Sequence, residues 1–194
     1  MKKWKIILSL CFFPLLLQGC NLQDNTDSVP STNNGSPYLV SKYEYQETKT
    51  INFKNKVKET QKITQTNIQD FLGDTLQADT FSNVSINPDG LILSTEEYNG
   101  VIHFLILNGY FLKEINIQAK AYDENTPILY CNNQLSETLT DTLQTYTFTF
   151  KRNITNFIIG AKVITQEGIE AKDRMILIEN MELVLTKRPI KINL

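Results

Sequence analysis

The fold follows from one stretch in the middle of the chain, Ile115-Asn116-Ile117-Gln118-Ala119-Lys120-Ala121-Tyr122. Its strict two-residue period places the apolar side chains on one face of a β-strand and the polar side chains on the other. The same alternation recurs at residues 146–150, 157–163 and 181–185. These stretches predict antiparallel strands with one face on a hydrophobic core and the other in water.

Residues that favour turns separate these stretches, at 87–90, 99–100, 108–109, 125–127 and 167–168. Residues 101–107 are apolar on both faces apart from His103, which predicts a central strand. From Phe81 onward we expect about seven or eight strands, a number typical of sandwich folds. The sequence therefore predicts an all-β protein, an antiparallel β-sandwich.

Residues 38–80 carry a mixed pattern. Tyr43, Tyr45, Ile51 and Phe53 fall at the two-residue steps of a strand. The apolar residues between 63 and 72 fall nearer to helical spacing, which allows one short helix near residues 61–72 that ends at Gly73. We assign residues 38–194 to the sandwich domain.

The strand layout of residues 91–187 resembles the jelly-roll domains of the galactose-binding-like and carbohydrate-binding-module superfamily. The resembling features are a strand and turn over residues 91–100, the strand 115–119 leading to Tyr122-Asp123, the strand 143–148, and closing strands from 176 to 185. The resemblance covers about half of the chain and implies a jelly-roll sandwich. It bears on the fold more than on the function, because one sandwich hosts many unrelated sites.

The first residues have the pattern of a secretion signal. Lys2, Lys3 and Lys5 precede an apolar run over residues 6–17, which is too short to span about 30 Å of hydrocarbon as a helix. The run ends in Leu17-Gln18-Gly19-Cys20, which resembles the lipobox of bacterial lipoproteins, although Gln18 is bulkier than the usual residue there. The resemblance implies that residues 1–19 are a signal peptide, cut before Cys20, and that the Cys20 thiol carries a diacylglyceryl group, with further acylation of the new amino terminus.

Residues 20–37 are almost entirely polar and predict a flexible tether between the lipid and the sandwich. Removal of residues 1–19 takes away three Lys and no acid, so 19 − 3 = 16 basic side chains face 21 acidic ones, a balance of −5. We therefore expect an extracytoplasmic domain that stands off a bacterial membrane on its anchor. In a cell with two membranes, Asn21 stands where the lipoprotein family commonly carries the Asp that marks inner-membrane retention, so the resemblance permits the outer membrane or cell surface without requiring it.

Several classes of function are disfavoured. The acidic balance and scattered lysines argue against nucleic-acid binding. Cys131 lies in an apolar run, without a partner once Cys11 is cut off and Cys20 is lipidated, which favours a buried, inert thiol over a disulfide between molecules. No phosphate-binding, dinucleotide, EF-hand or nucleophile-elbow motif occurs.

His103 is the one histidine, and its apolar surroundings favour a core or sheet-face role over a catalytic base or metal ligand. The adjacent acids Glu96 and Glu97 point to opposite faces if the strand continues, as do Asp123 and Glu124. We therefore expect no enzyme activity, no cofactor and no metal-ligand spacing of the zinc kind.

If consecutive strands run antiparallel, the loops at 96–100, 123–127 and 151–155 gather at one end of the sandwich. The predicted ligand-binding residues there are Glu96, Tyr98, Asn99, Asp123, Asn125 and Arg152. An aromatic ring beside amides, acids and one Arg suits a sugar, and the same acids could instead hold a structural Ca²⁺. Tyr110 and Tyr122 are further candidates for exposed aromatic rings.

Two functions stay open at this point. The first is a lipoprotein whose sandwich binds a glycan or cell-envelope polymer near the membrane. The second is a protein-interaction lipoprotein, such as an accessory subunit of an envelope complex, an adhesin or an exclusion factor, which needs no small-ligand site.

Overall fold

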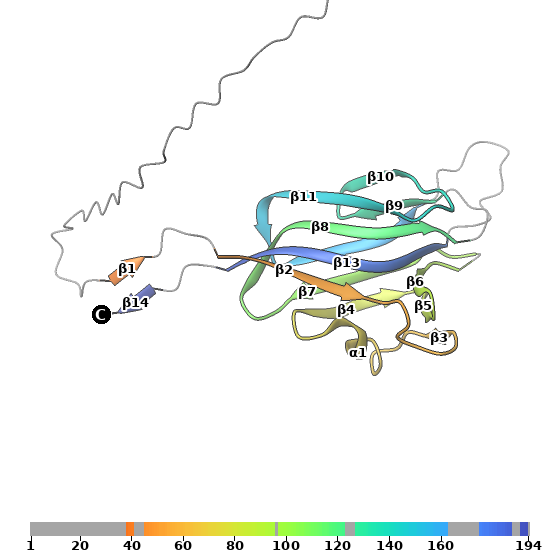
Figure 1. Ribbon diagram of the computed structural model, residues 1–194, viewed down its shortest axis with the longest axis horizontal. Coiled ribbons are helices and arrows are strands. Elements are labelled where there is room, and N and C mark those ends of the chain that lie inside the picture. The colour runs from red at the N-terminus through yellow and green to blue at the C-terminus, as the bar shows by residue number, and fades with distance from the viewer. Residues whose placement is uncertain are drawn as a thin grey trace, which may run out of the picture. The chain divides into compact units, whose positions relative to one another are not determined.

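The computed structural model describes residues 38–40, 45–95, 97–122, 127–162, 175–187 and 191–193. Fourteen strands and one short helix lie within these residues. Most of the strands belong to two antiparallel sheets that form a sandwich (Figure 1). A separate two-stranded ribbon pairs β1 (Tyr38–Val40) with β14 (Lys191–Asn193). The predicted all-β sandwich is confirmed.

The first sheet has five strands in the order β10-β9-β12-β7-β4. Their bounds are β4 (Leu76–Ser82), β7 (Val101–Ile106), β9 (Ile128–Cys131), β10 (Gln134–Thr138) and β12 (Asn156–Lys162). Strand β7 has neighbours on both sides, as the apolar run 101–107 predicted.

The second sheet has seven strands, ordered β11-β8-β13-β6-β5-β3, with β2 also paired to β13. Their bounds are β2 (Tyr45–Asn52), β3 (Gln61–Lys62), β5 (Val84–Asn87), β6 (Gly90–Leu93), β8 (Tyr110–Ala121), β11 (Gln144–Ile154) and β13 (Ile176–Lys187). The helix α1 (Gln69–Leu72) lies within the expected region and is followed by Gly73 at φ 71, a conformation that glycine adopts readily.

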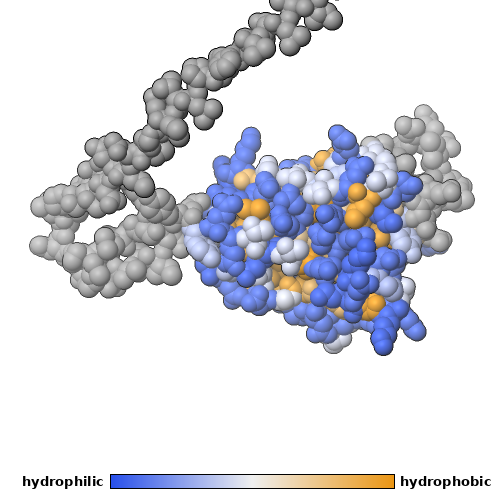
Figure 2. Space-filling view, in the orientation of Figure 1, coloured by the Kyte–Doolittle hydropathy of each residue, from blue (hydrophilic) through white to orange (hydrophobic). Residues whose placement is uncertain are grey.

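The hydrophobic core lies between the sheets and is built from the apolar faces that alternation predicted. Ile115, Ile117 and Ala119 of β8 are fully buried. Phe104 of β7 and Phe157 of β12 stack with ring centroids 5.0 Å apart. On the opposite face of β8, Asn116 accepts a hydrogen bond from Thr147 and Gln118 accepts one from Asn180. Hydrophilic side chains dominate the face of the molecule seen in Figure 2.

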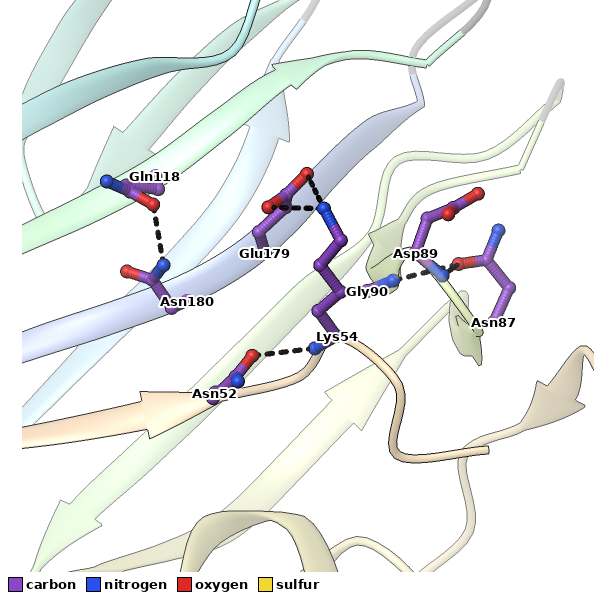
Figure 3. A network of polar contacts seen from close by, with 8 residues as sticks. All are labelled: Asn52, Lys54, Asn87, Asp89, Gly90, Gln118, Glu179 and Asn180. Atoms are coloured by element: carbon purple, nitrogen blue, oxygen red, sulfur yellow. Dashed lines mark hydrogen bonds and ion pairs between the residues drawn. The ribbon is translucent and has the colours of Figure 1, made fainter. Parts of the chain in front are cut away.

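Strand β13 has a bulge, and at this bulge it contacts both Lys54 and Gly90. The pairing with β8 shifts between Ile178 and Asn180, so Glu179 is the extra residue. Both carboxylate oxygens of Glu179 lie 3.1 Å from the ammonium of Lys54 (Figure 3). Gly90 approaches so closely that a Cβ there would lie 2.3 Å from the carbonyl oxygen of Ile178.

One hairpin was missed in the sequence. Strands β9 and β10 are joined at Asn132 and Asn133, with Asn132 in the left-handed region at φ 53. This short hairpin adds a strand between the loops 123–127 and 151–155, and so reverses which end of the sandwich the later loops occupy. No helix among the described residues is long and apolar enough to cross a membrane.

Candidate functional site

The loop between β6 and β7 is held tightly at both ends. Ser94 is buried with φ 79, and its N–H donates to the carbonyl of Asn83 at 2.9 Å. The Ser94 hydroxyl accepts from the N–H of Gly100 at 2.7 Å. A Cβ at Gly100 would lie 2.1 Å from the Ser94 nitrogen, so only glycine allows this approach. Ser94 and Gly100, at the two ends of the loop, are therefore held against each other.

Within this loop the backbone of Tyr98 is held by hydrogen bonds, while its side chain is exposed to solvent. The N–H of Thr95 donates to the carbonyl of Tyr98 at 2.9 Å, and the N–H of Tyr98 donates to the Thr95 hydroxyl at 3.0 Å. The Tyr98 side chain is 61% exposed, one of the few large apolar groups in water. An aromatic ring that is positioned before a ligand arrives lowers the ordering cost of binding.

Tyr98 borders a hollow of ≈ 600 Å³, which we call the Tyr98 hollow. The hollow lies on the outer face of the seven-stranded sheet, because Ser85 and Ile92 alternate with core residues of β5 and β6. Tyr122 is held beside it by a bond from its N–H to the carbonyl of Met175 at 2.9 Å. The lining residues are Thr60, Ser85, Ile92, Ser94, Thr95, Glu97, Tyr98, Tyr122 and Met175.

The lining combines two tyrosine rings with serine and threonine hydroxyls and one carboxylate, that of Glu97. Aromatic faces stack on the apolar face of a sugar ring, and hydroxyls exchange hydrogen bonds with sugar hydroxyls. The chemistry is therefore suited to a saccharide. No group of three His, Cys, Asp or Glu side chains that could hold a metal occurs within the described residues.

Only part of the predicted site is brought together. Tyr98 lines the hollow, while Asn99 is exposed beside it and uses its carbonyl to accept from the Asn83 amide at 2.9 Å. Three predicted residues lie outside the described part of the chain: Glu96, Asp123 and Asn125.

The expectation that residues 151–155 join this end is wrong. Arg152 belongs to β11, where the register places Ile154 opposite Leu112, whereas Tyr122 follows the other end of β8 at Ala121. At about 3.3 Å per residue, these two ends of β8 are roughly 30 Å apart. The missed hairpin at Asn132-Asn133 is the cause, because it changes the direction in which β11 runs.

Two other candidate residues are now placed. Tyr110, which was expected to be exposed, is 8% exposed and its hydroxyl donates to Glu47 at 2.7 Å. His103 is a sheet-face histidine, as predicted, and its Nδ1 lies 3.2 Å from Asp79 on the outer face of the five-stranded sheet.

The hydroxyls of the hollow could not be found from the sequence. Ser85 faces Ile92 across the β5–β6 hairpin, whose two-residue turn sets that register, but the sequence does not show that this face lies beside Tyr98. The outward position of Tyr122 could be predicted from the sequence, because Tyr122 continues the polar face of the alternating stretch 115–122.

Comparisons with known proteins give distant similarities only. The chain is similar to a family two carbohydrate esterase from Cellvibrio japonicus, with 10% sequence identity and a TM-score of 0.41 over 75% of this chain. It spans 36% of that esterase structure. It is also similar to a family 29 carbohydrate-binding module from Piromyces equi, with 13% identity and a TM-score of 0.44 over 72% of this chain and 90% of that one. No protein family matches the sequence, and no curated protein matches it.

Proposed function

We propose that this chain is a lipid-anchored, extracytoplasmic protein whose sandwich binds a glycan or cell-envelope polymer in the Tyr98 hollow. The observation that carries the proposal is the Tyr98 ring, which is 61% exposed although its backbone is hydrogen-bonded on both sides to Thr95. Exposure alone does not set Tyr98 apart from Tyr45; what favours a binding role is that the Tyr98 ring lines a hollow together with Tyr122 and several hydroxyl groups.

The anchor part of the proposal rests on the lipobox-like Leu17-Gln18-Gly19-Cys20. Two or three acyl chains on Cys20 would hold the chain stably on a bacterial membrane, in a two-membrane cell the outer membrane or surface. The acidic balance of the chain after Cys20 disfavours contact between the sandwich and anionic lipid headgroups.

We propose binding without chemical turnover. His103 is the single histidine of the sequence, and in the described part of the chain its side chain pairs with Asp79 and makes no hydrogen bond to a serine, threonine or cysteine side chain. A histidine activates a nucleophile through a direct hydrogen bond. The His103–Asp79 pair is therefore interpreted as a structural contact.

The test is a binding screen of the full chain, in mild detergent, on an array of glycans and peptidoglycan fragments with and without Ca²⁺. We expect a specific ligand whose binding is weakened about tenfold or more by Tyr98→Ala, because one stacking contact is lost. Tyr45→Ala is the matched control, since Tyr45 is 60% exposed and does not line the hollow. Equal binding by Tyr98→Ala, Tyr122→Ala and the unaltered chain would contradict the proposal.

The protein-interaction function is the second candidate, and one observation favours it. Strand β11 has 11 residues and lies at the edge of the seven-stranded sheet, where an extended segment of another protein could add as a further strand. A blank array together with a partner cross-linked at residues 144–154 in native membranes would favour this function over glycan binding.

A further inference from the structure

A second hollow lies on the other face of the sandwich. It has a volume of ≈ 680 Å³ and follows the outer face of the five-stranded sheet, and we call it the Tyr130 groove. Phe157, Ile159 and Ala161 of β12 point into the core, so Ile158 and Gly160 face outward into the groove region. The lining residues are Val101, Tyr130, Asn132, Asn133, Asn153, Ile154, Thr155, Asn156 and Ile158.

The floor of the groove carries an aromatic ring laid on a glycine. Tyr130 pairs directly with Gly160 across β9 and β12. A Cβ at position 160 would lie 2.5 to 2.7 Å from the Tyr130 hydroxyl and ring atoms, so the ring occupies the space that any side chain at 160 would need. Burial raises the pKa of the Tyr130 hydroxyl, which stays neutral. Val101 and Ile158 extend the apolar floor beside the ring.

Asparagine side chains line the rim. Asn132 is fixed, because its N–H donates to the carbonyl of Ile158 at 2.8 Å and its side-chain oxygen accepts from the Ile158 N–H at 2.9 Å. The side-chain amides of Asn133, Asn153 and Asn156 make no hydrogen bond within the described part of the chain, and all three residues are exposed. Each amide offers donors and an acceptor, which matches the hydroxyl groups of a sugar.

The lining holds no Lys, Arg, His, Asp or Glu. A charged ligand would therefore gain no opposite charge in the groove, and it would lose part of its hydration there. The Tyr98 hollow differs, since Glu97 contributes a carboxylate to its wall. The two hollows are thus suited to different ligands.

We propose that the Tyr130 groove is a second saccharide site, specific for an uncharged saccharide. The ring and the aliphatic floor contact the apolar face of the sugar, and the rim amides exchange hydrogen bonds with its hydroxyls. The inference goes beyond the proposed function, because it adds a separate site on the opposite face with a narrower ligand class. With both sites occupied, one protein links two glycan segments.

The test uses the full chain in mild detergent with the Tyr98→Ala substitution, which weakens binding in the Tyr98 hollow and leaves the groove unaltered. The probes are neutral oligosaccharides of glucose, galactose, mannose and N-acetylglucosamine, and an oligogalacturonate as the acidic probe, all measured by calorimetry. We expect at least one neutral probe to bind, the acidic probe not to bind, and affinity to be unchanged between about 0.05 and 0.5 M salt, because no charge takes part.

Two further substitutions in this background locate the site. Tyr130→Ala removes the ring, and Gly160→Ala keeps the ring but forces it off the sheet; each should weaken neutral binding about tenfold. Tyr45→Ala should change nothing, and thermal unfolding shows whether each variant folds. The proposal is overturned if no neutral probe binds, if the acidic probe binds as well, or if neither groove variant weakens binding.

The same measurements distinguish failure of the second site from failure of the proposed function at the Tyr98 hollow. Binding that is weakened by Tyr98→Ala and unaffected by Tyr130→Ala supports the proposed function and overturns the second site. Binding that is lost with Tyr130→Ala alone does the reverse.

Discussion

Cys131 is the only cysteine in the described part of the chain, and its side chain is completely buried in the core. Burial raises the pKa of its thiol from 9.0 to about 12, because a thiolate would lose its hydration there. At pH 8 only about one molecule in ten thousand then carries the reactive thiolate.

We therefore predict that iodoacetamide at pH 8 leaves the Cys131 peptide of the folded chain unmodified and alkylates it fully in denaturant. Peptide mass spectrometry measures both states. Rapid alkylation of the folded chain would show that Cys131 is accessible and would contradict its place in the core.

The same residue makes stability depend on pH in one direction. The folded pKa is about 12 and the unfolded value is 9.0, so the unfolded state releases its proton first as pH rises. This contribution is complete below pH 9.0 and is lost progressively between 9.0 and about 12. Cys131→Ala should remove that part of the alkaline decline, which urea unfolding at several pH values measures.

Asn132 stabilises the turn between β9 and β10, which the alternation of apolar and polar residues did not predict. Its φ of 53 suits Asn better than most residues, and its side chain accepts from Ile158 at 2.9 Å. Asn132→Ala should lower the free energy of unfolding by about 1–3 kcal/mol, since it strains the backbone and leaves an N–H unpaired. Asn133→Ala, at the exposed neighbouring position, should change it by less than about 0.5 kcal/mol. Equal urea midpoints for the two variants would contradict this account.

At the scale of elements, the strands with one buried face were predictable and the others were not. In β8, β11, β12 and β13 apolar side chains recur every second residue because they enter the core. Strand β10 has no such face, since Leu135 is 55% exposed and both Glu137 and Thr138 are exposed. Missing that one strand reversed the loops and placed Arg152 at the wrong end of the sandwich.

The residues of the candidate site were also only partly predictable from the sequence. Tyr98 was predictable because it lies in a loop marked by Asn99 and Gly100. The position of the Tyr130 ring on Gly160 depends on which residues of β9 and β12, two strands that do not follow each other in the sequence, face each other. That register is set by the packing of whole sheets, so a local pattern does not carry it.

The close approach of Gly90 to the backbone of β13 gives a prediction about stability. Gly90 has φ 154, and a Cβ there would meet the Ile178 carbonyl at 2.3 Å. Gly90→Ala should therefore cost about 2 kcal/mol or more, because backbone atoms must move. Lys54→Ala removes the nearby ion pair with Glu179, whose side chains are 45% and 16% exposed, and should cost below about 1 kcal/mol. Thermal unfolding measures the stability of both variants, and a larger loss of stability for Lys54→Ala than for Gly90→Ala would refute the steric argument.

At the scale of the whole molecule, the proposed lipid anchor and the two proposed binding sites would act together. A sandwich with a binding hollow on each face can contact polymer on either side while its tether holds it at the membrane. Because the effective concentration at a second site is high once the first is filled, such a protein would bind a polymer more tightly than a short oligosaccharide.

The anchor itself is tested in the cell of origin. We predict that radiolabelled palmitate enters the unaltered chain and not the Cys20→Ser variant, and that this variant moves from the membrane to the soluble extracytoplasmic fraction, because an acidic domain has little affinity for anionic lipid. The control is Cys131→Ser, which should stay labelled and membrane-bound. Label on Cys20→Ser would exclude lipid attachment at Cys20.

The central claim is that a glycan sits in the Tyr98 hollow. The most direct measurement is an NMR titration of the isotope-labelled full chain with the glycan that the array identifies. The account predicts the largest shift changes at Thr95, Tyr98 and Tyr122, with none at Tyr45, which lines neither hollow. Changes that leave all three residues untouched while the glycan binds would contradict it.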